Sequence, residues 1–363
     1  MANILDYLKW RGDIPFTQVT LNEIDSLILS RVSYFPFDNL IKENEQITIA
    51  EAYDRFEKEK EKGRILQIDD LNLFPLLAQS ERFKDLILTN YINKLDAKQE
   101  KQFAAITICL PNKLLYVSYR GTDNTLIGWK EDFNMSFSSH VPSQKDSANY
   151  LNEIARNYKG NIIVGGHSKG GNLAVYAATF CNDRAKKRII EVYNEDGPGF
   201  DEDIIATSEY HEMITKVHTY IPQSSVIGRL LNHQEAYTVV QSTATGIMQH
   251  DLYSWQVLGS KFISLEEVTN GSQFVDKTIK GWVKAVSPEQ RAQFIDILFE
   301  ILNSTDASTL SELSSKKLNT AKVLLKNYQN IDEENKEIIS KTIHALLDIV
   351  KENLKENITH KSL

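Results

Sequence analysis

A serine between two glycines is the strongest candidate for chemistry in this sequence. Ser168 lies in the run Gly166-His167-Ser168-Lys169-Gly170, which follows the apolar residues 162–164 and precedes a stretch of small and apolar residues typical of a helix. Strand, sharp turn and helix are the setting in which this pattern presents a nucleophile. Gly166 and Gly170 remove side chains that would collide with a crossing chain. We therefore predict Ser168 as a nucleophile; the alternative is a glycine-rich turn that serves packing or binds phosphate.

A second motif stands upstream, at the end of an expected strand. The segment Val117-Ser118-Tyr119-Arg120-Gly121-Thr122, followed by Trp129 and Asp132, resembles the Phe-Arg-Gly-Thr region of class 3 (fungal-type) lipases. The Ser168 motif also resembles the Gly-His-Ser-Leu-Gly-Gly of those enzymes. A closer resemblance is to a bacterial family that is related to class 3 lipases and catalogued as a domain of unknown function. That resemblance runs from Asp6 to Asp251 and leaves out the C-terminal helices.

The resemblance implies a serine hydrolase with two donors that hold an oxyanion. Thr122 would supply one of them, through its hydroxyl or its backbone N–H, and the backbone N–H of Lys169 would supply the other. Losing one such donor typically costs on the order of 3 kcal/mol of transition-state stabilisation. An ordinary residue at the end of a strand is the alternative role for Thr122.

The general base of such an enzyme follows the nucleophile in chain order. Of the six histidines downstream, four lie within the expected core at 101–262: His211, His218, His233 and His250. His250 comes after the last expected strand, where an imidazole would lie in a loop at the sheet edge, and the lipase resemblance points to the same residue. His233 is its main rival, whereas His218 falls within an expected strand and fits a packing role better.

The third catalytic residue of such an enzyme is an acid that orients the base, and it is not at the position that the resemblance implies. Class 3 lipases carry an aspartate after the strand that matches residues 217–221, but this sequence continues with Pro222-Gln223-Ser224-Ser225. Asp196 ends the preceding strand and is the best candidate, with Asp201 and Glu195 as alternatives. An aspartate that only forms a turn remains possible at this place.

The order of expected elements favours an α/β fold. Residues 103–110 and 114–119 form an expected antiparallel hairpin, and helices then alternate with strands at 161–164, 188–194, 217–221 and 237–240. Such alternation builds a mostly parallel sheet flanked by helices. We expect an α/β-hydrolase-type core at 101–262, a helical N-terminal segment packed on it at 1–100, and a helical C-terminal extension or cap at 263–363.

Composition and the absence of certain motifs indicate the partners, location and cofactors to expect. The 363-residue chain has a formal charge of −8, which argues against nonspecific binding to nucleic acid. We see no signal peptide and no apolar run long enough to cross a membrane, so we expect a cytoplasmic location. The two cysteines, Cys109 and Cys181, are expected to be free buried thiols. With no clustered metal ligands and no phosphate-binding loop, catalysis without a metal or cofactor is expected.

Hydrolysis of a carboxylic ester, lipid-like or small, through an acyl-enzyme on Ser168 is the activity that these motifs favour. Apolar helices leave room for transient contact with a membrane surface, and the oligomeric state stays open. Two other hypotheses remain: a degraded hydrolase that acts as a binding module, suggested by the missing acid after Ile221, and a serine acyltransferase.

Overall fold

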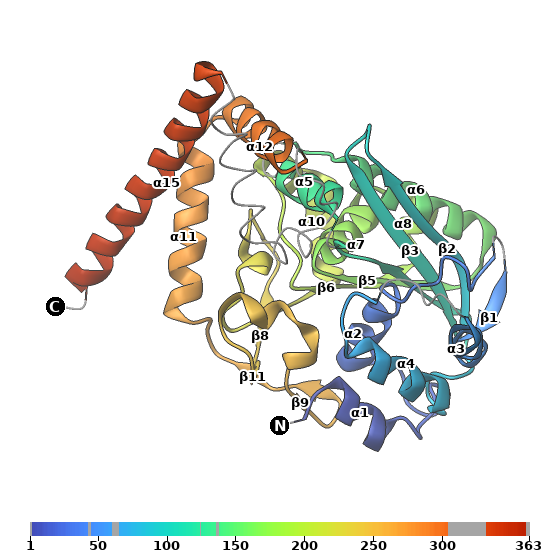
Figure 1. Cartoon of the computed structure of the whole chain (residues 1–363). Helices are drawn as coiled ribbons and strands as arrows, with labels where there is room; N and C mark the ends of the chain where they lie inside the picture. The colour runs from blue at the N-terminus through green and yellow to red at the C-terminus, as the bar shows by residue number, and fades with distance from the viewer. Residues whose placement is uncertain are drawn as a thin grey trace.

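The computed structural model describes residues 2–42, 45–59, 65–123, 125–135, 138–303 and 332–360. Within them, nine strands form one mixed sheet (Figure 1). In sheet order these are β1 (Gln46–Thr48), β2 (Ile87–Asp96), β3 (Lys101–Leu110), β4 (Leu114–Tyr119), β5 (Asn161–His167), β6 (Ile189–Glu195), β7 (Val217–Pro222), β8 (Tyr237–Val240) and β11 (Ser264–Leu265). The neighbours from β4 to β8 pair in parallel, and the strands at both edges pair antiparallel.

Helices cover both faces of the sheet. One face carries the N-terminal helices α1 (Ile4–Arg11), α2 (Glu23–Val32), α3 (Ile49–Lys58) and α4 (Asp70–Gln79). Packed on the other face or beside it are α6 (Pro142–Asn157), α7 (Lys169–Phe180), α8 (Asp183–Lys186), α9 (Glu202–Ile205) and α10 (Ser208–Met213). Short segments near the loops complete this part: η1 (Ile214–Lys216), η2 (Ile227–Arg229), η3 (Gly246–His250), η4 (Leu252–Ser254), β9 (Val257–Leu258) and β10 (Lys261–Phe262).

The side chains of β4 point alternately to the two faces of the sheet, and each face has its own apolar core. Side chains on a strand point to opposite faces in turn. Tyr116 faces α2, where its hydroxyl lies 2.8 Å from the hydroxyls of both Ser26 and Ser30. Leu115 and Val117 are buried in the other core with residues of α6 and α7. The central strands are therefore covered on both sides, as expected for strands that pair in parallel.

The predicted fold class is confirmed: a helix-flanked sheet with parallel central strands, preceded and followed by helices. The antiparallel hairpin of β3 and β4 is also as predicted. Sequence patterns missed β1 and β2, which extend the sheet into residues predicted to be mainly helical. A bulge between Thr89 and Ile92, with Asn90 at φ 52°, breaks the alternation of β2, so the strand has no regular period-2 pattern. The proposed division into domains stays a prediction.

Buried ion pairs fix the N-terminal helices to one another. Arg82 donates to both carboxylate oxygens of Asp25 at 2.8 and 2.6 Å, and both side chains are fully buried. The Tyr7 hydroxyl donates to the same carboxylate at 2.7 Å. A buried charge is tolerated only when its partners satisfy it, so these contacts define one arrangement of α1, α2 and the segment before β2.

The C-terminal helices pack on one another and on the body. They are α11 (Asn270–Ala285), α12 (Pro288–Asn303) and α15 (Glu333–His360); Figure 1 shows α11 and α15 side by side, with α12 beside α5 (Leu126–Asn134). The Trp282 indole donates to the carbonyl of Thr342 at 3.1 Å. Lys130 of α5 pairs with Asp296 of α12 at 2.8 Å. Among the described helices, none has both the length and the apolar character of a membrane span.

Replacing Asp25 with alanine should lower the free energy of unfolding by about 3–5 kcal/mol, because it leaves the buried Arg82 guanidinium without a counter-charge. Urea denaturation of the full chain measures the loss. Asp348→Ala is the matched control, since Asp348 pairs with Lys351 in an exposed position, and it should change stability little. Equal effects of the two changes would contradict this account of the N-terminal helices.

Candidate active site

The turn between β5 and α7 holds Ser168 in a strained conformation. Its backbone adopts φ 61° and ψ −135°, a region that residues other than glycine rarely occupy and that costs of order 1–3 kcal/mol. A Cβ at Gly166 would lie 2.3 Å from the carbonyl oxygen of Gly170, and one at Gly170 would lie 2.2 Å from that of Tyr119. Both predicted glycines are thus required by the close approach of the elbow to the end of β4.

Ser168 lies between the ends of β4 and β6. The N–H of Ser168 donates to the carbonyl of Glu195 at 2.9 Å. A Cβ added at Gly121 would lie 3.0 Å from the Cβ of Ser168. The Ser168 side chain is partly exposed, whereas both of its neighbours in the chain are buried. The Arg-Gly-Thr segment and the serine elbow, far apart in sequence, therefore meet at one place.

His250 and Asp196 are brought together across the ends of the sheet. Nδ1 of His250 lies 2.6 Å from Oδ2 of Asp196. The carboxylate is buried, whereas about a quarter of the His250 side chain is exposed (26%). A carboxylate at Nδ1 fixes the ring orientation and leaves Nε2 as the nitrogen that can exchange a proton. The structure thus brings together two of the predicted site residues, and their catalytic roles stay a prediction.

The other candidate acids make different contacts. Asp201 caps α9, accepting from the N–H of Ile204 at 2.9 Å. Glu195 points to the opposite face of the sheet, where its carboxyl accepts from the Ser26 hydroxyl at 2.8 Å. Asp196 is therefore the one of the three candidates that is hydrogen-bonded to His250.

The rival histidines also have other partners. His233 forms its own pair with Glu235, 2.8 Å from Nδ1 to Oε1. Burial raises the pKa of that carboxyl, but the hydrogen bond and charge of His233 outweigh it and bring the pKa to about 2. His218 lies in β7, within the strand predicted for it, where its exposed ring stacks on Tyr193 at 5.1 Å between ring centroids. His211 lies on α10, next to Tyr210.

Two residues beside the serine were not recognised from the sequence as part of the site. The His167 ring lies 4.6 Å from that of His250 between centroids, and its Nε2 lies 2.9 Å from the His250 carbonyl oxygen. The Tyr34 hydroxyl accepts from the N–H of Gly121 and donates to the His167 carbonyl, both at 3.0 Å. Burial, reinforced by the nearby His250 and Arg31, holds the pKa of His167 well below its usual value. A neutral His167 can stay against His250 without repelling an imidazolium.

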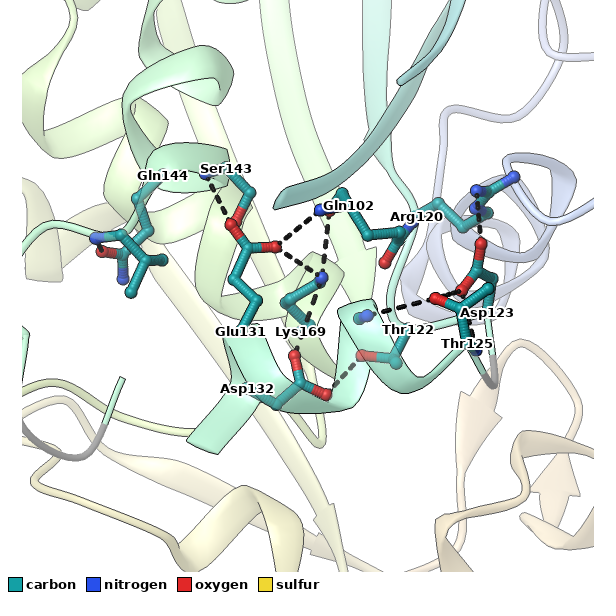
Figure 2. A network of polar contacts seen from close by, with 12 residues as sticks. Gln102, Arg120, Thr122, Asp123, Thr125, Glu131, Asp132, Ser143, Gln144 and Lys169 are labelled. Atoms are coloured by element: carbon teal, nitrogen blue, oxygen red, sulfur yellow. Dashed lines mark hydrogen bonds and ion pairs between the residues drawn. The ribbon is translucent and has the colours of Figure 1, made fainter. Parts of the chain in front are cut away.

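The Lys169 side chain is buried in a polar network with the helix that follows the Arg-Gly-Thr segment (Figure 2). Its ammonium donates to the carbonyl of Gln102 at 3.0 Å and to Glu131 at 3.1 Å, and lies 3.7 Å from Asp132. Glu131 also accepts from the N–H of Ser143 at 2.9 Å. The elbow is thereby tied to α5 and to the start of α6 through one cation.

Thr122 has its hydroxyl engaged within this network. It donates to Asp132, whose pKa burial raises to about 6 against the opposing effect of Lys169. A hydroxyl has one proton to donate, so with Asp132 ionised the backbone N–H of Thr122 is the group left to face an oxyanion. Lys169 is the first residue of α7, and its N–H has no acceptor within the helix.

Comparison with known proteins assigns the family. The model of the Mbeg1-like family matches residues 77–300. The chain belongs to the Mbeg1-like family. The match begins later than the resemblance seen in the sequence motifs and extends into α12. No curated protein matches the chain.

Several chains of solved structures match this one, two lipases among them. The native Rhizomucor miehei lipase propeptide complex is 13% identical, with a TM-score of 0.34, over 49% of this chain and 70% of that one. M37 lipase is also 13% identical, with a TM-score of 0.37, over 65% of this chain and 82% of that one. Neither likeness assigns a residue or an activity to this chain.

Buried Glu195 should make stability depend on pH. Burial raises the pKa of its carboxyl to about 8, so in the pH range between its ordinary value and 8 the folded chain keeps a proton that the unfolded chain releases. The free energy of unfolding should then fall as pH rises, by up to about 1.4 kcal/mol per pH unit. Glu195→Gln should remove this slope in denaturation curves from pH 5 to 8.

The control for this experiment is Glu202→Gln, which changes an exposed glutamate in the same part of the chain. It should leave the slope unchanged. Parallel curves for the wild type and Glu195→Gln would show that Glu195 does not hold the proton.

Proposed function

We propose that this protein is a serine hydrolase that cleaves carboxylic esters through an acyl-enzyme on Ser168. The single observation that carries the proposal is the 2.6 Å contact of His250 with Asp196, at the edge of the sheet where the strained elbow presents Ser168. A nucleophile on such an elbow followed by an oriented imidazole is the arrangement used for acyl transfer. The contact also favours an active enzyme over a degraded hydrolase, because Asp196 can supply the acid that is missing after β7.

In the proposed reaction, Nε2 of His250 takes the proton of the Ser168 hydroxyl as its oxygen attacks the acyl carbonyl. The alcohol leaves with that proton, and water then attacks the acyl-enzyme with His250 again acting as base. The bond from the Ser168 oxygen to the acyl carbon breaks, the carboxylic acid leaves, and His250 returns the proton to Ser168. Asp196 stabilises the imidazolium formed in each half. The backbone N–H groups of Lys169 and Thr122 would hold the oxyanion, helped by the N-terminus of α7.

An ester with an apolar acyl part is the substrate that the surroundings favour. Ile247 and Met248 lie three and two residues before His250 in η3, and 58% and 67% of their surface is exposed. Adjacent exposed apolar side chains beside a candidate base suit an acyl chain better than a charged group. Ser136 and Phe137, which the sequence also suggests as lining of an acyl pocket, lie outside the described residues.

A fluorophosphonate probe tests the nucleophile. Wild type should be labelled once per chain and should hydrolyse nitrophenyl esters, whereas Ser168→Ala should lose both properties. His250→Ala should lose at least about 10³-fold in kcat, as is typical when a triad member is removed. His233→Ala, matched in residue type and also paired with a carboxylate, should retain activity at equal folded yield. An unlabelled, folded wild type would exclude the proposed function.

Asp196→Asn tests the acid by changing its charge and little else. An asparagine amide would donate to Nδ1 of His250 and place the ring proton on Nε2, so the imidazole could no longer take the serine proton. The corresponding change in a well-studied Ser-His-Asp triad lowers kcat by about 10⁴. Asp201→Asn is the control, since Asp201 caps α9, and it should keep kcat within about twofold of the wild type. Comparable losses in the two variants would refute the assignment of Asp196.

A further inference from the structure

The contacts on the far oxygen of Asp196 come from the loop that follows β7. While Oδ2 faces His250, Oδ1 accepts from the Ser225 hydroxyl at 2.5 Å and from the N–H of Gly228 at 3.2 Å. The Gly228 N–H also lies 3.1 Å from the Ser225 hydroxyl oxygen. Asp196 and Ser225 are both buried. Every polar contact described for this carboxylate is thus made either by the candidate base or by this loop.

The loop is shaped to bring these donors close to the carboxylate. A Cβ at Gly228 would lie 2.3 Å from Oδ1 of Asp196, so a side chain at that position would displace the carboxylate. Asp196 itself has φ 53°, which a residue with a side chain adopts only when its surroundings hold it. Rotation of the carboxylate away from His250 would break two further hydrogen bonds inside a buried site.

We propose that Ser225 is a positioning residue that holds Asp196 in line with His250. The inference rests on the proposed function and deepens it. The residues that follow β7, Pro222-Gln223-Ser224-Ser225, include no carboxylate, and the Ser225 hydroxyl is instead aimed at the acid that follows β6. Ser225 supplies a charge-assisted hydrogen bond that fixes this acid in place.

The C-terminal extension anchors the same loop. The Ser272 hydroxyl of α11 donates to the carbonyl of Ser225 at 2.6 Å, and Arg229 pairs with Asp276 of α11 at 2.6 Å. Just before α11, the N–H of Thr269 donates to the carbonyl of Gln223 at 2.7 Å. Through Ser225, α11 therefore contributes to the placement of the acid without touching the reacting groups.

Ser225→Ala in the full chain tests the proposal. It should lower kcat for a nitrophenyl ester by about tenfold or more, the usual consequence of losing a hydrogen bond to a charged group, while KM changes little. Ser224→Ala is the matched control: it removes the same hydroxyl from the neighbouring position, where it bonds Thr269 instead, and kcat should stay within twofold. Equal losses in the two variants would overturn the proposal.

A double-mutant cycle separates positioning from a general loss of structure. In an Asp196→Ala background, Ser225→Ala should cause no further decrease in kcat, because the group that it positions is gone. A purely structural role would give the same tenfold loss in both backgrounds and refute the proposal. Ser225→Thr, which keeps the hydroxyl, should restore most of the activity, and Ser225→Cys, with a weak S–H donor, should not.

A spectroscopic measurement keeps this inference distinct from the proposed function. The proton shared by His250 and Asp196 should give a downfield NMR signal, identified by its loss in His250→Ala. Ser225→Ala should shift or broaden this signal, and Ser224→Ala should leave it in place. An unlabelled wild type whose signal responds to Ser225 would refute the hydrolase and keep the positioning role. A labelled wild type whose signal is unchanged in Ser225→Ala would keep the proposed hydrolase and refute the positioning role of Ser225.

Discussion

The close approach of two backbones is the constraint on which the rest of this structure depends. The elbow after β5 passes so near the end of β4 that a Cβ would not fit at position 166 or 170, and both residues are glycine. That approach places Ser168 beside the Arg-Gly-Thr segment and directs the N-terminus of α7 toward the same point. Parallel pairing of β4, β5 and β6 then brings the ends of the next strands alongside, so the carboxylate that follows β6 arrives at the same edge.

Buried ion pairs hold the surrounding helices in place against the elements that form the site. Arg31 of α2 forms a two-point ion pair with Asp70, both contacts at 2.6 Å, and Asp70 also accepts from the Tyr253 hydroxyl at 2.7 Å. On the other side, Lys169 holds α5 through Glu131. Each pair is costly to break, so the loop after His250 and the helix after Thr122 have one favoured position each. Buried ion pairs of this kind therefore join α2 and α5 to the surroundings of the site.

What the sequence could predict follows from the range of the interactions involved. The elbow is a local pattern of strand, glycines and helix, so Ser168 and its glycines could be recognised directly. His250 was predicted from its place after the last expected strand and from the lipase resemblance, and Asp196 from its place at the end of a strand. Their contact depends on a parallel sheet, which the alternation of helices and strands indicated. Tyr34 could not be predicted as part of the site, because it meets His167 across 133 residues and nothing near it in the chain marks the meeting. The Lys169 side chain was overlooked for a related reason. Only the backbone N–H of Lys169 had an expected role, and the carboxylates that pair with its ammonium lie on α5, far away in the sequence.

The loop that carries His250 is closed by the opposite end of the chain. Asn3 donates to the carbonyl of Tyr253 across 250 positions, and the N–H of Phe262 donates to Glu23 across 239. Contacts between residues so distant in sequence form late and slowly, since a long loop must close before they contribute. During synthesis, α1 and α2 leave the ribosome long before their partners exist and must wait with part of their polar surface unpaired. The proposed base would thus be set in place near the end of folding.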